Sequence, residues 1–419
     1  MIAPKLRFSE FKDDWFETNL GKQTTYIKGF AFKSNEYQNE GIRIVRVSDL
    51  AQSAIKTNNE KIFIAFENSY KYVNWKIIKN DIIVTTVGSK PHLIDSAVGR
   101  PIFINKNNEG FLNQNLLLLR DIPELSNSYF IYSCLLDKRY LNHVEIIQRG
   151  NANQSNITVL DLMDFKFFTT SIQEQTKIAE FLSAVDDKIS QLSRQLELLN
   201  QYKKGVMQKI FSQEIRFKND NGEDFEGWDF VELGEICDLI TKGTTPTSIG
   251  GNFINKGISF IKIESINENG NFIREKFAFI DESTNKLLNR SILKENDILF
   301  SIAGALGRVA IVDSSILPAN TNQALAIIRL KNKDFTKFIY YFLNSEKIKK
   351  LIENESVQLA QANFSLSQLS KIEIALPSIQ EQAKIAKFLT AIGERIDHTT
   401  AQLTHTKQWK KGLLQQMFV

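Results

Sequence analysis

Apolar positions recur at alternating steps of four and three residues in two stretches of the chain, 171–211 and 378–418. This spacing, sustained over more than thirty residues, predicts a coiled-coil seam on a long helix. No proline interrupts either stretch, so each is expected to form one continuous helix. In the first stretch the seam positions are Ile178, Leu182, Val185, Ile189, Leu192, Leu196, Leu199, Lys203, Val206 and Ile210. In the second they are Ile385, Leu389, Ile392, Ile396, Thr399, Leu403, Thr406, Lys410, Leu413 and Met417.

The two stretches are copies of each other. Aligned without a gap, they share 20 identical positions, including "SIQEQ" at both starts. A duplicated helix within one chain most simply pairs with its own copy. An antiparallel pair would place the intervening segments at opposite ends of a rod about 57 Å long.

The predicted seams contain polar residues at equivalent places, most clearly Lys203 and Lys410. One interpretation is that these lysines extend their ammonium groups to solvent near a frayed helix end. The other is that they fix the register and the pairing of the helices at some cost in stability. The sequence leaves both open.

The remaining segments, 1–170 and 212–377, are also related, although more distantly. Each has an aromatic-rich lead, a Gly-centred loop ("YIKGFAFKSNEY" and "ITKGTTPTS"), an Asn-Asp turn feeding a strand, and an Asn-Gln turn ("LNQNLLLL" and "TNQALAII"). Many short strands with a few helices predict α+β domains. The expected organisation is a pseudo-twofold repeat with two recognition heads, 1–170 and 212–377, and two antiparallel spacer helices, 171–211 and 378–419.

The loops of the heads are the candidate binding sites. They carry the side-chain types that bond phosphates and base edges. The short hydroxyls of "GTTPTS" equally fit an ordinary Thr/Pro turn. The amide-rich stretches "QRGNANQSN" and "VQLAQANFS" equally fit polar connectors, but their recurrence at equivalent places favours a function.

Several classes of protein find no support in the sequence. It has no G-x-x-x-x-G-K-[ST] phosphate loop, no Pro-Pro motif of amino-methyltransferases, and no glycine-rich cofactor turn. Four histidines and two distant cysteines form no metal set or disulfide framework, and no apolar run reaches the length of a membrane span. We therefore expect a cytoplasmic, non-catalytic chain without a metal or cofactor of its own.

The predicted helices account for the whole net charge of +4. Residues 171–211 carry +1 and residues 378–419 carry +3, so the two heads together are neutral. Because affinity for DNA grows with the number of phosphates neutralised, neutral heads should bind DNA weakly by themselves. If DNA is the ligand, a partner protein is expected to supply part of the contacts with it.

Taken together, these motifs resemble the specificity subunit of type I restriction–modification systems. The resemblance covers essentially the whole chain and is carried by the twice-used "IQEQ-x-KIA-x-FL" helix entry, the duplicated helices and the "GFAFKSNEY", "GTTPTS", "NDIL" and "NQ" segments. It implies that each head reads one half of a bipartite, asymmetric site on double-stranded DNA, and that the helices set the gap. It also implies two methyltransferase partners that bind S-adenosylmethionine and methylate adenine. Motor/nuclease partners would use ATP and magnesium.

Candidate DNA contacts follow from the positions of polar residues in the loops, with lysines expected mostly at phosphates and amides mostly at bases. In the first head they are Lys28, Lys33, Ser34, Lys90, His92, Asn113, Gln114, Arg149, Asn153 and Gln154. In the second head they are Lys242, Thr244, Thr245, Thr247, Ser248, Arg308, Asn322, Gln323, Gln361 and Asn363.

Two other classes of function remain as alternatives. The chain could be a scaffold with lectin-like or peptide-binding heads, which would leave no DNA footprint in the presence of a methyltransferase. It could also be a nuclease with an acidic metal site, for which Glu264 and Glu282 are available. No paired carboxylates in a catalytic arrangement support the nuclease.

Overall fold

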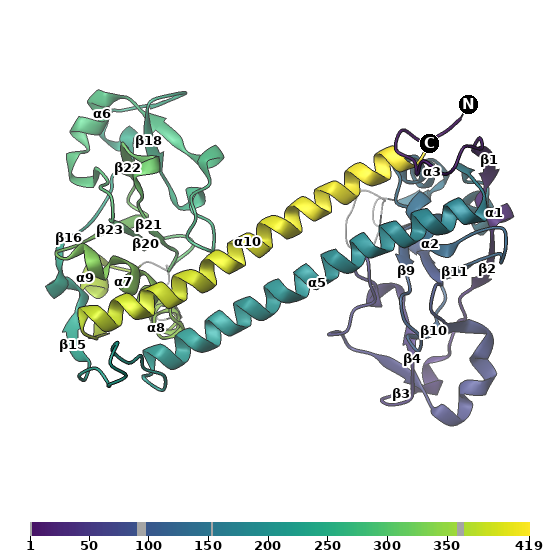
Figure 1. Ribbon diagram of the computed structural model, residues 1–419, viewed down its shortest axis with the longest axis horizontal. Helices are drawn as coiled ribbons and strands as arrows, with labels where there is room; N and C mark the ends of the chain where they lie inside the picture. The colour runs from purple at the N-terminus through teal and green to yellow at the C-terminus, as the bar shows by residue number, and fades with distance from the viewer. Residues whose placement is uncertain (1, 90–97, 152–153, 358–363) are drawn as a thin grey trace. The chain divides into compact units, whose positions relative to one another are not determined.

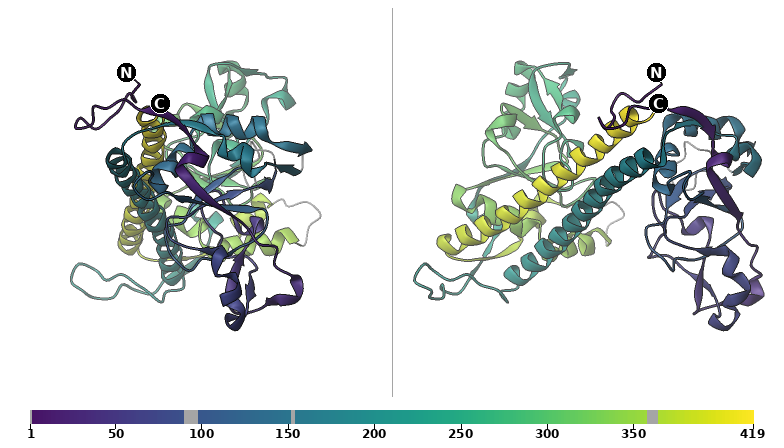
Figure 2. Two further views of the ribbon diagram at one scale, coloured as in Figure 1. Left: turned by 90° about the vertical axis from the view of Figure 1, so that its right-hand side faces the viewer. Right: turned by 45° about the vertical axis from the view of Figure 1, so that its right-hand side comes forward.

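The computed structural model describes residues 2–89, 98–151, 154–357 and 364–419. The chain divides into two compact units (Figures 1 and 2). Unit 1 consists of Met1–Ser193 and Gln402–Val419, and unit 2 of Arg194–Ala401. Each unit therefore contains one head and a part of both long helices, α5 (Ile172–Phe211) and α10 (Ile379–Met417).

The central sheet of unit 1 is antiparallel, and its strands have the order β2-β11-β7-β9. Both faces of this sheet are packed, because the leucines of strand β11 point alternately into two hydrophobic cores. Leu117 and Leu119 pack on the side of the helices, and Leu116 and Leu118 pack on the opposite side. The four strands are β2 (Thr24–Lys28), β7 (Ile82–Thr85), β9 (Pro101–Phe103) and β11 (Leu116–Asp121).

A second sheet lies on the side of the central sheet opposite the long helices. Two small sheets contain the other described strands of unit 1. The second sheet contains β3 (Tyr37–Gln38), β4 (Ile42–Val45), β5 (Ile62–Ile64), β6 (Lys76–Ile77) and β10 (Gly110–Leu112). The small sheets contain β1 (Phe16–Asn19) with β14 (Lys166–Thr169), and β8 (Val87–Gly88) with β12 (Arg149–Asn151) and β13 (Gln154–Asn156). The described helices include α1 (Leu20–Gln23), α2 (Ser128–Cys134), α3 (Lys138–Ile147), α4 (Val159–Met163) and the 3-10 helix η3 (Phe66–Trp75).

Unit 2 repeats this plan. Its central antiparallel sheet has the order β16-β23-β20-β21, with β16 (Cys237–Lys242), β20 (Ile298–Ser301), β21 (Val309–Ile311) and β23 (Leu325–Leu330). Ala326 and Ile328 face the core that includes α5 and α10, whereas Leu325 and Ile327 face the second sheet. The same alternation in both heads confirms that they are copies of one α+β fold.

The remaining elements of unit 2 match those of unit 1 in kind. The second sheet contains β17 (Phe253–Ile254), β18 (Ile258–Ile261), β19 (Ala278–Ile280) and β22 (Ala319–Thr321), and a small sheet pairs β15 (Asp229–Glu232) with β24 (Glu373–Leu376). The described helices include α6 (Glu282–Leu287), α7 (Thr336–Leu343), α8 (Glu346–Val357) and α9 (Leu366–Ser370).

The helices α5 and α10 pack against each other in each unit. In unit 1, Lys410 lies 2.6 Å from Asp186. In unit 2, a Cβ atom on Gly393 would lie 3.9 Å from the ammonium nitrogen of Lys203. Lys203 comes 17 residues after Asp186 on α5, whereas Gly393 comes 17 residues before Lys410 on α10. The helices are therefore antiparallel, as the sequence predicts.

A buried ion pair fastens each head to the start of a long helix. In unit 1, Arg7 contacts the carboxylate of Glu174 at 2.7 Å through two nitrogens, and the indole of Trp15 donates to the same carboxylate. In unit 2, Arg216 and Trp228 bond Glu381 in the same way. The repeated "IQEQ" motif is therefore a structural clasp: its glutamate is buried, and its partners come from the segment that opens each head, residues 7–15 or 216–228.

Candidate nucleic-acid interface

The Gly-centred loop and the Asn-Gln turn lie against each other in both heads. A Cβ atom on Gly29 would lie 1.8 Å from the backbone oxygen of Asn113, and one on Gly243 would lie 1.8 Å from that of Thr321. No side chain fits at this distance. The glycines are thus required because two backbones approach closely, and they bring together loops that are far apart in sequence.

Backbone hydrogen bonds fix these loops. In the first head, the amide of Gln114 donates to the carbonyl of Phe30 at 2.8 Å, and Gly29 donates to Leu116 at 2.9 Å. In the second head, Gly243 donates to Asn322 at 3.1 Å, and the hydroxyl of Thr245 donates to the side-chain oxygen of Gln323 at 2.5 Å. In both heads the Gly-centred loop is thus bonded to the segment of the Asn-Gln turn, although the individual bonds differ.

Further segments join the same end of the central sheet. Thr86, after β7, donates to Asn115 at 2.9 Å, and its carbonyl accepts from Ile157 after the β12–β13 hairpin. In the second head, Ile302 donates to Ala324, and its carbonyl accepts from Phe364. We define these converging segments as the loop cluster: 28–34, 86–89, 112–115, 149–151 and 154–156 in the first head, and 242–248, 302–308 and 321–324 in the second.

The first head exposes most of its described candidate residues. The exception is Asn113, whose side chain is buried, and its contact with DNA stays a prediction. The guanidinium of Arg149 bonds the carboxylate of Asp161 at 2.9 Å. The exposed candidates are Lys28, Lys33, Ser34, Gln114, Arg149 and Gln154. All of these belong to the loop cluster, which therefore presents lysines and amides together.

The loop cluster of the second head carries more hydroxyl side chains than that of the first head. Thr244 is half-buried and accepts a hydrogen bond from Arg290 at 3.1 Å. Arg308 is half-buried and donates to the backbone oxygen of Ile266 at 2.8 Å, so part of its guanidinium supports the neighbouring loop. The exposed candidates are Lys242, Thr247, Ser248 and Gln323, and Thr245 and Asn322 are half-buried.

Five predicted contacts lie outside the described residues. They are Lys90, His92, Asn153, Gln361 and Asn363. Each belongs to a stretch that adjoins Ser89, Gln154 or Phe364 in the sequence. These five contacts stay predictions.

The Asn-Asp turn of each head has a structural role that its sequence did not reveal. Asn80 and Asn296 adopt positive φ angles of 73° and 72°, which asparagine tolerates better than most residues. The next residue, Asp81 or Asp297, is buried and pairs with an arginine of the central sheet, Arg120 or Arg329, at 2.7 Å. The partners are 39 and 32 residues apart in sequence, so spacing alone could not identify the pair.

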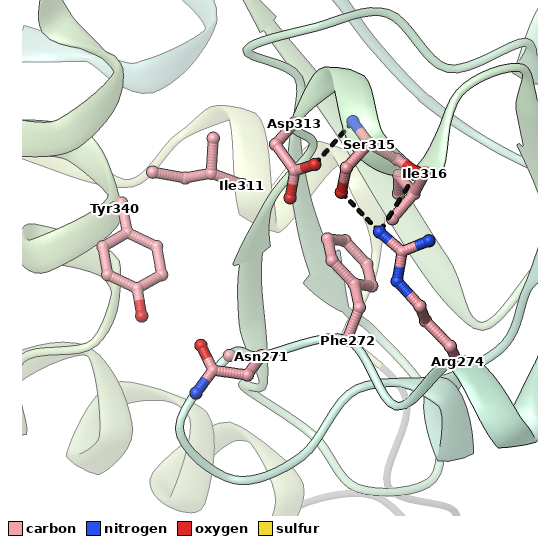
Figure 3. Close-up of a pocket in the computed structure, with 9 residues that line it drawn as sticks. Asn271, Phe272, Arg274, Ile311, Asp313, Ser315, Ile316 and Tyr340 are labelled. Atoms are coloured by element: carbon pink, nitrogen blue, oxygen red, sulfur yellow. Dashed lines mark hydrogen bonds between the residues drawn. The ribbon is translucent and has the colours of Figure 1, made fainter. Parts of the chain in front are cut away.

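The structure also places a hollow of about 320 Å³ in the second head (Figure 3). Phe272, Arg274, Asp313 and Tyr340 line it, and Arg274 donates to Ser315 at 2.7 Å. None of the predicted contacts lines this hollow, so it is separate from the loop cluster.

The described residues contain no group of three or more His, Cys, Asp or Glu side chains arranged to hold a metal ion. His143, for example, shares a hydrogen bond with the backbone oxygen of Asp161 at 2.8 Å. Within the same described part of the chain, no helix has both the length and the apolar character to span a membrane.

The fold and the loop clusters define a class of protein: a duplicated chain with two binding heads joined by paired long helices. Residues 12–201 and 225–406 match the family model described as "Type I restriction modification DNA specificity domain". The chain belongs to this family and carries two such domains. It is a DNA sequence-specificity subunit, which has a non-catalytic role.

Individual relatives agree with this assignment. The chain is 29% identical to the putative type I restriction enzyme MjaX specificity subunit of Methanocaldococcus jannaschii, over 98% of this chain and 94% of the relative. It is 24% identical to the type I restriction enzyme EcoBI specificity subunit of Escherichia coli, over 94% of this chain and 84% of the relative.

Among solved structures, the fold is similar to the type I restriction-modification S subunit from M. genitalium. The TM-score is 0.64 at 17% identity, covering 100% of this chain and 99% of that one. A chain solved in work on the complex assembly and conformational transition of the type I R-M system matches with a TM-score of 0.54 at 17% identity, over 96% of both chains. At these identities the similarity describes the fold alone.

Proposed function

We propose that each head reads one half of a bipartite, asymmetric DNA site through its loop cluster. The observation that carries this proposal is the repeated backbone frame. Gly29 with Asn113 and Gly243 with Thr321 hold corresponding loops in the two heads. The exposed side chains on these loops are the same at some places, such as Lys28 and Lys242, and differ at others, such as Lys33 and Thr247. Corresponding frames whose exposed side chains are only partly the same support two readers of the same kind that recognise different bases.

Within each cluster, the lysines position the DNA and the amides specify its sequence. Lys28 and Lys242 occupy equivalent exposed ends of strands β2 and β16, where an ammonium group can neutralise a phosphate. Gln114 and Gln323 follow the asparagine of the two Asn-Gln turns and are exposed. A glutamine amide can bond adenine with two hydrogen bonds in the major groove.

The paired helices α5 and α10 set the gap between the two half-sites. They contain 40 and 39 residues. At about 1.5 Å per residue, such a helix is about 60 Å long, or about 18 base pairs at about 3.4 Å per pair. A two-headed reader of one face of the duplex needs a spacing related to the helical repeat of about 10 base pairs.

The chain would act as the core of a larger complex. Two methyltransferase subunits would dock on it, bind S-adenosylmethionine and methylate adenine. Motor/nuclease subunits would supply ATP- and magnesium-dependent translocation and cleavage. The neutral charge of the two heads supports a requirement for partners in DNA binding, and a complex acting on genomic DNA would work in the cytoplasm.

The test uses the complex of the full chain with its cognate methyltransferase. Affinity is measured for a duplex carrying the methylated motif and for duplexes in which either half is scrambled. Gln114→Ala should relax base preference in one half only, and Gln323→Ala in the other, each by about 1–3 kcal/mol at one position. If both variants relax the same half, or neither changes any preference, the two-reader proposal is wrong.

A further inference from the structure

The first head exposes three large apolar side chains on the 3-10 helix η3. Phe66 is 70% exposed, Tyr70 is 72% exposed and Val73 is 61% exposed. We call these residues the apolar ridge. The opposite side of η3 is anchored, because Tyr72 is buried against Phe32 and Phe111. The ridge is therefore held on a fixed support and faces away from the core.

The second head shows that the fold does not need apolar residues at these places. Residues 66–81 align without a gap with 282–297, with buried Tyr72 at the place of buried Leu288, and both segments end on the Asn-Asp turn. The second-head residues at the ridge positions are Glu282, Lys286 and Asn289. Glu282 and Lys286 form an exposed ion pair at 3.5 Å. Leu287, 70% exposed, stands instead where the first head has Lys71.

The helix η3, which carries the ridge, contacts the loop cluster through its last residue. The indole of Trp75, the last residue of η3, donates to the backbone oxygen of Lys28 at 3.0 Å. Its ring centroid lies 4.5 Å from that of Phe30 in the Gly-centred loop. The support of the ridge thus also fixes the loop that carries two of the predicted phosphate contacts, Lys28 and Lys33.

The charge around the ridge suits a polyanion. Between Phe66 and Lys79 the chain has three lysines, Lys71, Lys76 and Lys79, and one acidic residue, Glu67. All three lysines are exposed, and Lys71 lies 5.8 Å from the ring centroid of Tyr70. Apolar and aromatic side chains flanked by lysines are typical of groove contacts, where an apolar group packs on thymine methyls or against a base step.

We infer that the apolar ridge is a DNA contact of the first head and contributes to the specificity of its half-site. The inference rests on the proposed function and adds a second reading element beside the loop cluster. The second head has polar residues at the ridge positions and presents Leu287 on the corresponding segment. The two heads therefore differ in apolar as well as polar contacts.

The test replaces the ridge with the residues of the second head: Phe66→Glu, Tyr70→Lys and Val73→Asn in one chain. The full chain is purified with its cognate methyltransferase, and assembly, thermal stability and affinity for the methylated-motif duplex are measured. The matched control is Phe16→Glu, which changes an apolar residue of β1 that is 53% exposed. Binding of the wild-type complex to its motif is measured first, and this measurement tests the proposed function independently of the ridge.

The expected result is an intact complex whose affinity for the motif falls about tenfold or more. Scrambling the first half-site should then cost less than in the wild type, whereas scrambling the second half-site should cost the same. Unchanged affinity overturns the inference. Loss of assembly with the methyltransferase also overturns it, because the ridge would then be a protein contact. If the triple variant does not fold, the single variant Tyr70→Ser is tested in its place. Unchanged affinity or loss of assembly in that variant would again overturn the inference.

Discussion

Lys410 on α10 and Asp186 on α5 form an ion pair at 2.6 Å within unit 1, and the hydroxyl of Tyr129 donates to the same carboxylate. The internal repeat places Lys203 at the position of Lys410, and Gly393 at the position of Asp186. Lys203 consequently faces a glycine, and burial lowers its pKa. Both copies of the seam contain the lysine, but only one contains the carboxylate.

Removing that carboxylate should destabilise unit 1. Asp186→Asn leaves the ammonium group of Lys410, whose side chain is only 16% exposed, without its charged partner. The expected loss is about 1–2 kcal/mol in the free energy of unfolding, between the values for surface and buried pairs. Urea denaturation measures it, with Asp187→Asn at the exposed neighbouring position as the control. An equal effect of both changes would show that the ion pair does not stabilise the helices.

Restoring the missing carboxylate should stabilise unit 2. A Cβ atom on Gly393 would meet Lys203 Nζ and Tyr341 Oη at 3.9 Å, which are ordinary contacts. Gly393→Ala should add about 0.5–1 kcal/mol, because glycine is a poor helix former. Gly393→Asp should match or exceed Ala by pairing with Lys203, although aspartate has the lower helix propensity. Thermal denaturation of the three chains checks this order, and Asp falling well below Ala would contradict it.

The pH dependence of stability should report on Lys203. Its folded pKa lies below the ordinary value of 10.5 because burial disfavours the ammonium form. Between the two pKa values the unfolded chain binds more protons, so this residue's contribution becomes more favourable as pH rises. The difference in unfolding free energy between wild type and Lys203→Met should therefore grow in favour of wild type from neutral pH toward pH 10.5. A pH-independent difference would contradict the assigned burial.

The two clasps should be equally sensitive to loss of their glutamates. Glu174→Gln and Glu381→Gln each leave an arginine, Arg7 or Arg216, facing a neutral side chain in a buried site. Breaking a buried pair in this way costs about 3–5 kcal/mol. Limited proteolysis should cut the segment that leads into the head, residues 2–15 or 212–228, faster in the corresponding variant only.

Each clasp variant has a matched control at the preceding, exposed glutamine of the same motif. These controls are Gln173→Ala and Gln380→Ala. Neither should change the rate at which the lead is cut. Faster cutting in a control, or an unchanged rate in Glu174→Gln and Glu381→Gln, would show that the ion pair does not hold the lead.

The long helices and their pairing could be predicted from the sequence because one period runs through both copies. Alternating steps of four and three define the face of each helix that is buried, and the duplication supplies the partner. The register could not be predicted in the same way. It depends on which residue of α5 meets Lys410, and several acidic residues are available along that helix.

The loop cluster could be predicted in its location but not in its construction. The Gly-centred loops and Asn-Gln turns are repeated polar segments, which suggests ligand contact rather than the close backbone approach at Gly29 and Gly243. Asn113, one of the candidate contacts, is buried in the structure, which its place in a polar turn did not indicate. Sequence does not distinguish the apolar ridge either, because Phe66 and Tyr70 look like core residues until the burial of Tyr72 fixes the orientation of η3.

In the proposed function, two different heads each read one half of a DNA site. This arrangement determines which sequence motif is methylated in cells that carry this chain with its cognate methyltransferase. Sequencing of the methylated genome determines that motif. We expect two unlike blocks of defined bases separated by a gap of fixed length, with one methylated adenine on each strand. A single continuous motif, or two identical blocks in palindromic order, would contradict the existence of two different readers in one chain.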